Sequence, residues 1–364
     1  MRNALTPLSL LFCSFFLSGM PGAALAQSVA DQAEAPKPSQ SAIELQCEAG
    51  DSKACLNAGR IFAALSGEER AEKARFLFGK GCELGDDTAC HLLVPMLIDG
   101  YGGDPDLAGA EALAARLCHA GSAQGCSWQA NVISRRVASG AGDQAEFEQV
   151  RALYLSGCDG GIAEACGQAG AMLATGMGGG ADVNEGWALL NRACEVEQAQ
   201  ACANVGIMLR DGIGREPQPL LARDYFARGC DGDVAFACNE AGVLWMQLAD
   251  ASGEERWREA ALRAFQKACA GSDASGCNNA ARQLHMGHGV PRDARGAFDL
   301  AQRGCDLGHA GACYRAATMR RDGDGVGLDL IVWLELADRA CRLGHAQACN
   351  ASLDEEPASV AGAS

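Results

Sequence analysis

The sequence contains little lysine, few aromatic residues and few prolines. Only five of its 364 residues are lysines, aromatic residues make up 5% and there are 10 prolines. Acidic residues outnumber basic residues by 46 to 30, which gives a formal net charge of −16. Because phosphate binding needs a basic surface, this charge balance argues against nucleic acid as a partner.

Long apolar runs are missing after the N-terminus, so we expect no integral membrane segment in the mature chain. The first 26 residues combine Arg2, an apolar run over 8–17 and an Ala-Leu-Ala sequence that ends at Ala26. This is the pattern of a secretory signal peptide cleaved after Ala26. We therefore expect a periplasmic or secreted protein, whose polar residues 27–42 form a disordered leader.

Cysteine, in contrast, is abundant. One of the 19 cysteines, Cys13, lies in the signal peptide, and the other 18 form nine pairs. In every pair seven residues separate the two cysteines, and successive pairs begin 35 to 40 residues apart. A fixed period in this range is typical of repeat proteins. We expect a single array of about eight helix pairs with terminal half units over residues 43–353, followed by a disordered tail at 354–364.

The segment inside each cysteine pair predicts a reversal of the chain. A continuous helix would hold the two Cα atoms about 12 Å apart, whereas a disulfide requires about 7 Å or less. Glycine often stands three residues after the first cysteine, as at Gly85 and Gly308, where a left-handed conformation would end a helix. Glu197, Asp233 and Ser272 replace this glycine, and the segment around Glu197 has no glycine at all.

A small residue recurs four positions after the second cysteine and favours close approach of the paired helix. It is a glycine or an alanine at Gly59, Ala130, Gly170, Gly206, Gly242, Ala281 and Ala317. Val94 breaks the pattern, and Pro95 beside it should kink its helix.

Together, the motif C-x-x-G-x-x-x-A-C-x-x-x-G, the glycine loops and the period near 36 resemble the cysteine-rich Sel1-like repeats of the Hcp-like kind, which are often labelled β-lactamase-like. The resemblance extends over the whole array. It implies an all-α fold, a right-handed α-solenoid of TPR-related helix pairs, in which one disulfide joins each unit to the next. The implied disulfides are Cys47–Cys55, Cys82–Cys90, Cys118–Cys126, Cys158–Cys166, Cys194–Cys202, Cys230–Cys238, Cys269–Cys277, Cys305–Cys313 and Cys341–Cys349.

Candidate catalytic residues are sparse. The β-lactamase-like label makes β-lactam hydrolysis the enzymatic alternative, but no lysine has a serine three residues before it, and K-T-G, S-D-N and G-x-S-x-G are absent. His285 and His288 flank a glycine loop and are interpreted as surface residues, while His309 and His345 occupy matching turn positions. We expect no catalytic residues, no metal and no cofactor. If the chain is an enzyme, a β-lactamase-like hydrolase is the expectation.

Protein or peptide binding is the favoured function, because curved solenoids present extended surfaces. The residue two positions after each second cysteine should face the concave side, and we call this set the first-helix row. It comprises Asn57, Trp128, Gln168, Asn204, Glu240, Asn279 and Arg315, together with Leu92 and Ala351.

Amide side chains in this row would suit an extended peptide backbone, and tryptophan and arginine are typical of binding hot spots. The competing interpretation, that the asparagines are solvated consensus residues, stays open. We expect a non-enzymatic interaction scaffold with a protein or peptide ligand. The alternatives are an Hcp-like protein that binds or weakly hydrolyses β-lactams, and a redox or cofactor-linked assembly factor.

Overall fold

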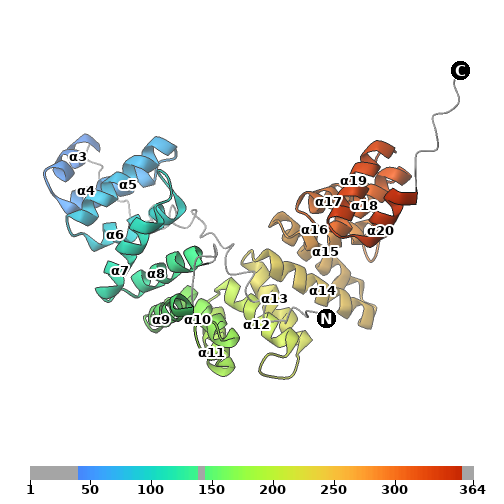
Figure 1. Ribbon diagram of the computed structural model, residues 1–364, viewed down its shortest axis with the longest axis horizontal. Coiled ribbons are helices and arrows are strands. Elements are labelled where there is room, and N and C mark those ends of the chain that lie inside the picture. Colours follow the sequence, from blue (N-terminus) through green and yellow to red (C-terminus); the bar gives the residue numbers. More distant parts are fainter. Residues whose placement is uncertain (1–39, 138–143, 355–364) are drawn as a thin grey trace, which may run out of the picture. The chain divides into compact units, whose positions relative to one another are not determined.

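The computed structural model describes residues 40–137 and 144–354 (Figure 1). The expected signal peptide at 1–26, most of the expected leader and nearly all of the expected tail lie outside the described residues. The helix α3 (Gln40–Glu48) begins inside the segment that we expected to be leader. Ile43 packs against the first hydrophobic cluster, and Cys47 is bonded to Cys55, so these later residues of α3 hold the helix in place.

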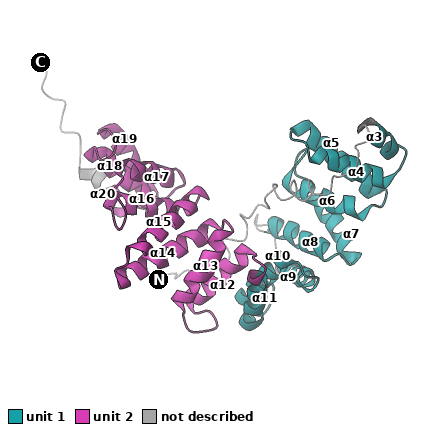
Figure 2. Ribbon diagram, turned by 180° about the vertical axis from the view of Figure 1, so that it is seen from behind, with its two compact units in different colours: residues 1–193 teal, residues 194–364 magenta. Residues whose placement is uncertain are grey.

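The chain divides into two compact units, residues 1–193 and 194–364 (Figure 2). The helices that follow α3 in unit 1 are α4 (Ser52–Ala63), α5 (Glu68–Glu83), α6 (Asp87–Asp99), α7 (Leu107–His119), α8 (Ala123–Arg136), α9 (Gln144–Asp159), α10 (Ala163–Thr175) and α11 (Val183–Glu195), whose last two residues begin unit 2. The remaining helices of unit 2 are α12 (Ala199–Asp211), α13 (Pro219–Asp231), α14 (Ala235–Ser252), α15 (Glu255–Ala270), α16 (Ala274–Met286), α17 (Ala294–Asp306), α18 (Ala310–Asp322), α19 (Leu330–Arg342) and α20 (Ala346–Asp354).

Consecutive helices form pairs. We call the even-numbered helices first helices and the odd-numbered ones second helices. Within unit 1, α4 contacts α6 and α6 contacts α8; within unit 2, α12, α14, α16 and α18 contact one another in order. Each unit therefore has a layer of first helices backed by second helices. The predicted all-α solenoid of helix pairs is confirmed.

All the predicted disulfides are present. Their Cα atoms lie 4.4–4.7 Å apart, although the cysteines are eight positions apart in the sequence. Each bond joins the end of a second helix to the start of the next first helix, as Cys82 of α5 is joined to Cys90 of α6. The chain reverses between the two cysteines, as the spacing predicted.

The reversal depends on one residue in the left-handed region. The glycines at the third position, such as Gly85 and Gly308, have φ values of +89° and +88°. Glu197, Asp233 and Ser272 adopt the same conformation with φ values of +63°, +64° and +68°. The repeat therefore imposes this turn even where the sequence offers no glycine, although a side chain there strains the backbone.

A helix cap follows the turn, four residues before the second cysteine. Asp86 and Ser122 accept a backbone N–H of the following helix there, at 2.9 and 3.0 Å. His309 and His345 do the same with Nδ1, at 3.1 and 3.3 Å. This agrees with the interpretation of the two histidines as turn residues.

A glycine at this position of a first helix lies against a large side chain of its second helix in several repeats. A Cβ atom added to Gly206 would lie 2.7 Å from Phe226, and one added to Gly59 would lie 2.6 Å from Phe78. The residue 20 positions further on, in the second helix, is an alanine after Val94, Ala281 and Ala317, and all six side chains are buried; these pairs are Val94/Ala114, Ala281/Ala301 and Ala317/Ala337. In Val94/Ala114 the larger side chain is on the first helix, so that volume is exchanged relative to Gly206/Phe226. This exchange explains why valine is tolerated at position 94. Pro95 lies inside α6, which continues to Asp99.

Candidate binding face

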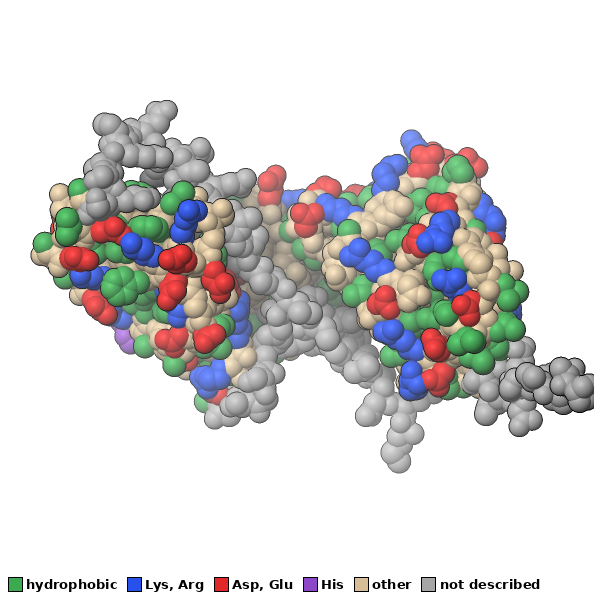
Figure 3. Space-filling model, turned by 90° about the horizontal axis from the view of Figure 1, so that it is seen from above, with side chains coloured by type: hydrophobic (Ala, Val, Ile, Leu, Met, Phe, Trp, Pro, Cys, Tyr) green, Lys and Arg blue, Asp and Glu red, His purple; other side chains and the backbone are tan. Residues whose placement is uncertain are grey.

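Catalytic and metal-binding clusters were sought first. The described residues contain no group of three or more His, Cys, Asp or Glu side chains that could hold a metal ion. Among the helices that the structure describes, none is both long and apolar enough to cross a membrane. On the face shown in Figure 3, described acidic and basic side chains are interspersed.

His285 belongs to an ion-pair cluster that links two loops of unit 2. Its Nε2 lies 2.7 Å from Asp324 Oδ2, and Arg292 Nη2 donates to Asp324 Oδ1 at 2.7 Å. The hydrogen bond from Arg292, followed by that from His285, lowers the pKa of the Asp324 carboxyl. The cluster ties the loop after α16 to the loop after α18, which gives His285 a structural partner that the sequence did not reveal.

The first-helix row has members in three environments. Asn57 is exposed. Trp128 and Asn204 are buried, with 8% and 3% of their surface accessible. The half-buried members are Leu92, Gln168, Glu240, Asn279 and Arg315, and the side chain of Ala351 lies outside the described residues.

The two buried members cannot serve as open ligand contacts. Trp128 joins the first hydrophobic cluster of unit 1, and its ring lies 5.6 Å from that of His91. Asn204 lies in a stretch of α12 in which every residue from 201 to 209 is buried, and its Oδ1 accepts from Gln200 at 3.4 Å. At these two positions neighbouring residues enclose the side chain instead of leaving it on an open face.

Two half-buried members bridge neighbouring first helices. Glu240 of α14 accepts from Arg210 of α12 in an ion pair. Asn279 Nδ2 of α16 donates to Asn239 Oδ1 of α14 at 2.9 Å. The row therefore lies where adjacent first helices meet, and part of its polar capacity is used inside the protein.

Arg315 differs from these members. It lies on α18 beside α16, and the combination of its burial and the charge of Arg282 lowers its pKa below the usual arginine value. Its Nε atom is buried without a hydrogen-bond partner. Arg315 thus has unused hydrogen-bonding capacity on the first-helix layer.

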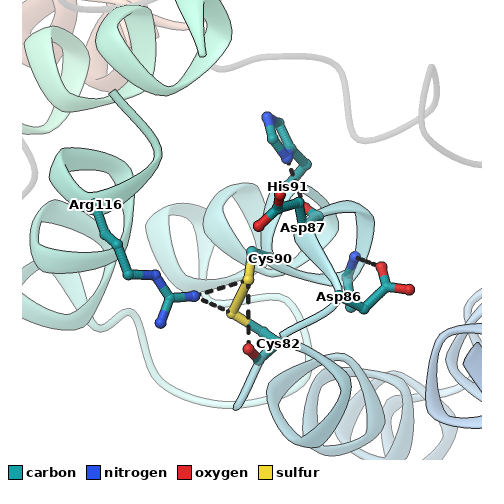
Figure 4. Close-up of a disulfide and its surroundings, with 7 residues drawn as sticks. Cys82, Asp86, Asp87, Cys90, His91 and Arg116 are labelled. Carbon is teal, nitrogen blue, oxygen red and sulfur yellow. Dashed lines mark hydrogen bonds between the residues drawn. A yellow bond between two sulfur atoms is a disulfide. The ribbon is translucent and has the colours of Figure 1, made fainter. Parts of the chain in front are cut away.

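A recurring basic residue, two positions before the first cysteine, covers the preceding turn. Arg116 Nη2 lies 2.9 Å from both sulfurs of the Cys82–Cys90 disulfide, as Figure 4 shows. Arg228 and Arg303 donate to carbonyl groups at the ends of the preceding second helices, at 2.5 and 3.0 Å. A cation stabilises a helix C-terminus, so this position is structural. Sequence analysis missed it, although the recurrence is visible; its members are Lys80, Arg116, Arg192, Arg228, Lys267, Arg303 and Arg339.

Comparisons with known proteins identify the repeat. The Sel1 repeat model matches residues 52–86, 163–196, 199–234, 274–309 and 310–345. A Sel1 repeat protein from Oxalobacter formigenes shares 16% identity and a TM-score of 0.56, over 96% of this chain and 93% of its own. A putative sel1 repeat protein from Klebsiella pneumoniae shares 24% identity, over 56% of this chain and 98% of its own, with a TM-score of 0.36.

Helicobacter pylori cysteine rich protein B shares 22% identity, over 36% of this chain and 91% of its own, with a TM-score of 0.29. No curated protein matches the chain. The Oxalobacter structure supports the solenoid fold, and the disulfides recur with the repeat. Nine disulfides are also typical of proteins that fold in an oxidising compartment outside the cytoplasm. The chain is therefore a cysteine-rich array that contains five Sel1 repeats.

Proposed function

We propose that this chain is an exported, non-enzymatic scaffold that binds a protein or a peptide along its first helices. The proposal rests on the half-buried polar side chains that occupy the same repeat position on several first helices. Repeat solenoids commonly bind partners along such extended surfaces. Gln168 and Asn57 have amide groups that donate and accept hydrogen bonds, as an extended peptide backbone requires.

The binding test uses the mature chain and a displayed library of random dodecapeptides. Selected peptides should bind the wild-type chain, and Gln168→Ala and Asn57→Ala should weaken binding by about tenfold, which corresponds to roughly 1.4 kcal/mol. Glu72→Ala and Gln266→Ala, on exposed positions of second helices, are the matched controls and should bind like the wild type. Failure to select any peptide, or equal losses in both sets of variants, would contradict the proposal.

Export has its own test. The signal pattern predicts that the protein recovered from outside the cytoplasm begins at Gln27, and N-terminal sequencing measures this directly. A mature protein that retains the first 26 residues would contradict cleavage after Ala26.

β-Lactam hydrolysis is not favoured, since the sequence lacks the serine–lysine arrangement of serine β-lactamases. Nitrocefin turnover by the purified mature chain distinguishes the two functions. Clear turnover that is lost on mutation of a surface residue would overturn the scaffold proposal.

A further inference from the structure

We propose that α16 and α18 of unit 2 bind a carboxylate group of a peptide ligand between the guanidinium groups of Arg282 and Arg315. The inference rests on the proposed peptide-binding function and adds the chemistry of one ligand group. The carboxylate is either an Asp or Glu side chain or the C-terminus of the peptide.

The two arginines lie on neighbouring first helices. Arg315 stands two residues after Cys313 in α18, and Arg282 stands five residues after Cys277 in α16. These helices contact each other (Figure 1). Burial is the main cause of the lowered pKa of Arg315, and the charge of Arg282 is the second. Two like charges therefore lie on first helices that contact each other, an arrangement that an anion between them would stabilise.

Partners for these arginines are missing in the part of unit 2 that the structure describes. Arg292 and Arg210, like most arginines of unit 2, form ion pairs with carboxylates. In contrast, the side chains of Arg282 and Arg315 have no ion pair or hydrogen bond with any described residue, and Nε of Arg315 is buried without an acceptor. Covering a guanidinium without pairing it is unfavourable, and a bound carboxylate would offset that cost.

The local charge contrasts with that of the whole chain. The net charge is −16, yet α16 has Arg282 and no acidic side chain, and α18 has Arg315, Arg320 and Arg321 against Asp322 alone. Arg321 is paired with Asp322. Basic side chains thus outnumber acidic ones on these two adjacent first helices of an acidic chain, which matches a ligand of opposite charge.

Polar and aromatic groups adjoin the pair. Tyr314, next to Arg315, stacks on His345 of α20 with ring centroids 4.3 Å apart and an interplanar angle of 23°. Asn278 on α16 has a buried Oδ1 without a hydrogen-bond partner. The guanidinium fork recognises a carboxylate through two parallel hydrogen bonds.

The test measures binding of labelled decapeptides to the full mature chain by fluorescence anisotropy. The first probe carries four Glu among Gly and Ala and has a free C-terminus. The second has Gln in place of Glu, the third keeps Glu but has an amidated C-terminus, and the fourth has Lys in place of Glu. The variants are Arg282→Gln, Arg315→Gln and their combination, with Arg315→Lys to keep the charge without the fork. Arg256→Gln and Arg263→Gln on α15 remove the same charge from exposed positions of a second helix.

If Glu side chains supply the carboxylate, the Glu probe should bind at least tenfold more tightly than the Gln and Lys probes; if the C-terminus supplies it, the Glu probe should bind at least tenfold more tightly than the amidated probe. The double variant should abolish whichever preference is found. Arg315→Lys should lose part of it, and the α15 variants should retain it. The amidated probe separates the two sources of the carboxylate: retained affinity assigns side chains, and lost affinity assigns the C-terminus. Equal affinity for the Glu, Gln and amidated probes, no measurable binding of the Glu probe, or an unchanged preference in the folded double variant overturns the inference. Library-selected peptides that bind while the Glu preference is absent would leave the scaffold function standing.

Discussion

Units 1 and 2 share one repeat register but differ in the side chains that they place on their first helices. In unit 1 the row includes Leu92 and Trp128, and Trp128 is buried against His91. In unit 2 the same position holds Glu240, which pairs with Arg210, and Arg315, which is unpaired among the described residues. The comparison shows that the register fixes the backbone, the disulfides and the core, while the chemistry of the row varies from unit to unit.

The largest expected effect tests whether the disulfides are equivalent in the two units. Replacing both cysteines of Cys82–Cys90 or of Cys341–Cys349 by alanine should lower the free energy of unfolding by about 2.6 kcal/mol in each case, since both close loops of equal length. Urea titration of each variant measures this loss. Losses that differ strongly between units would show that local contacts, rather than loop closure, dominate.

The same two disulfides should also differ in their rates of reduction. Cys82 and Cys90 are 5% and 0% exposed and lie beside Arg116, whereas Cys341 and Cys349 are only half-buried. Access limits the rate at which a thiolate attacks a disulfide. Mass spectrometry after timed treatment with a mild reductant and alkylation should find Cys341–Cys349 reduced first. Simultaneous reduction of both bonds would contradict the burial argument.

The next effect tests the exchange of volume between paired helices. Gly206→Val in unit 2 should destabilise the protein by about 1–3 kcal/mol, because the new side chain meets Phe226. Adding Phe226→Ala copies the pair Val94/Ala114 of unit 1 and should restore much of the stability. A double-mutant cycle measured by thermal unfolding gives the coupling. If the two losses simply add, the volume exchange does not explain the core.

A smaller effect concerns the three turns without the expected glycine, all of which lie in unit 2. Ser272→Gly should stabilise the protein by about 1 kcal/mol, since glycine adopts a positive φ without a clash. The reverse change in unit 1, Gly85→Ala, should cost a similar amount. Chemical denaturation measures both. A stabilising Gly85→Ala variant would contradict the view that one turn conformation serves both units.

Sequence reasoning was sufficient for the fold because the information is local and repeated. The cysteine spacing, the turn residue and the small residue after the second cysteine depend on neighbours within one helix pair. Even the exceptions at Glu197 and Val94 follow the repeat, since a positive φ and an exchange of volume accommodate them. The recurring basic residue at Arg116 was open to the same reasoning, because it too repeats with the period.

The first-helix row was harder to predict because the environment of its side chains depends on contacts between neighbouring repeats. The position in the repeat correctly placed Asn204 and Glu240 on first helices. It did not predict that Asn204 is buried or that Glu240 forms an ion pair with Arg210. The pairing of Asp324 with His285 and Arg292 joins loops more than 30 positions apart in the sequence. No single-repeat pattern contains these partners, so only the packed structure shows which side chains are already satisfied.

The smallest expected effect compares two helix caps in equivalent positions, Ser122 in unit 1 and His309 in unit 2. Burial lowers the pKa of His309, with smaller contributions from the charges of Arg315 and His345, while Asp273 opposes the shift. The folded state therefore favours the neutral His309 ring. This preference adds to the free energy of unfolding above the usual histidine pKa of about 6.5, and the added free energy is lost as the pH falls through the lowered pKa. His309→Asn keeps an acceptor for the Ala312 N–H and removes the titration, so thermal unfolding should show similar stability at pH 7.5 and a more stable variant at pH 5, by less than about 1 kcal/mol. Because Ser122 Oγ also lies 2.8 Å from His91 Nε2, the control is measured with His91→Gln in both proteins compared; Ser122→Asn should then show no such pH dependence, and if the two cap variants change in parallel with pH, the titration lies elsewhere in the protein.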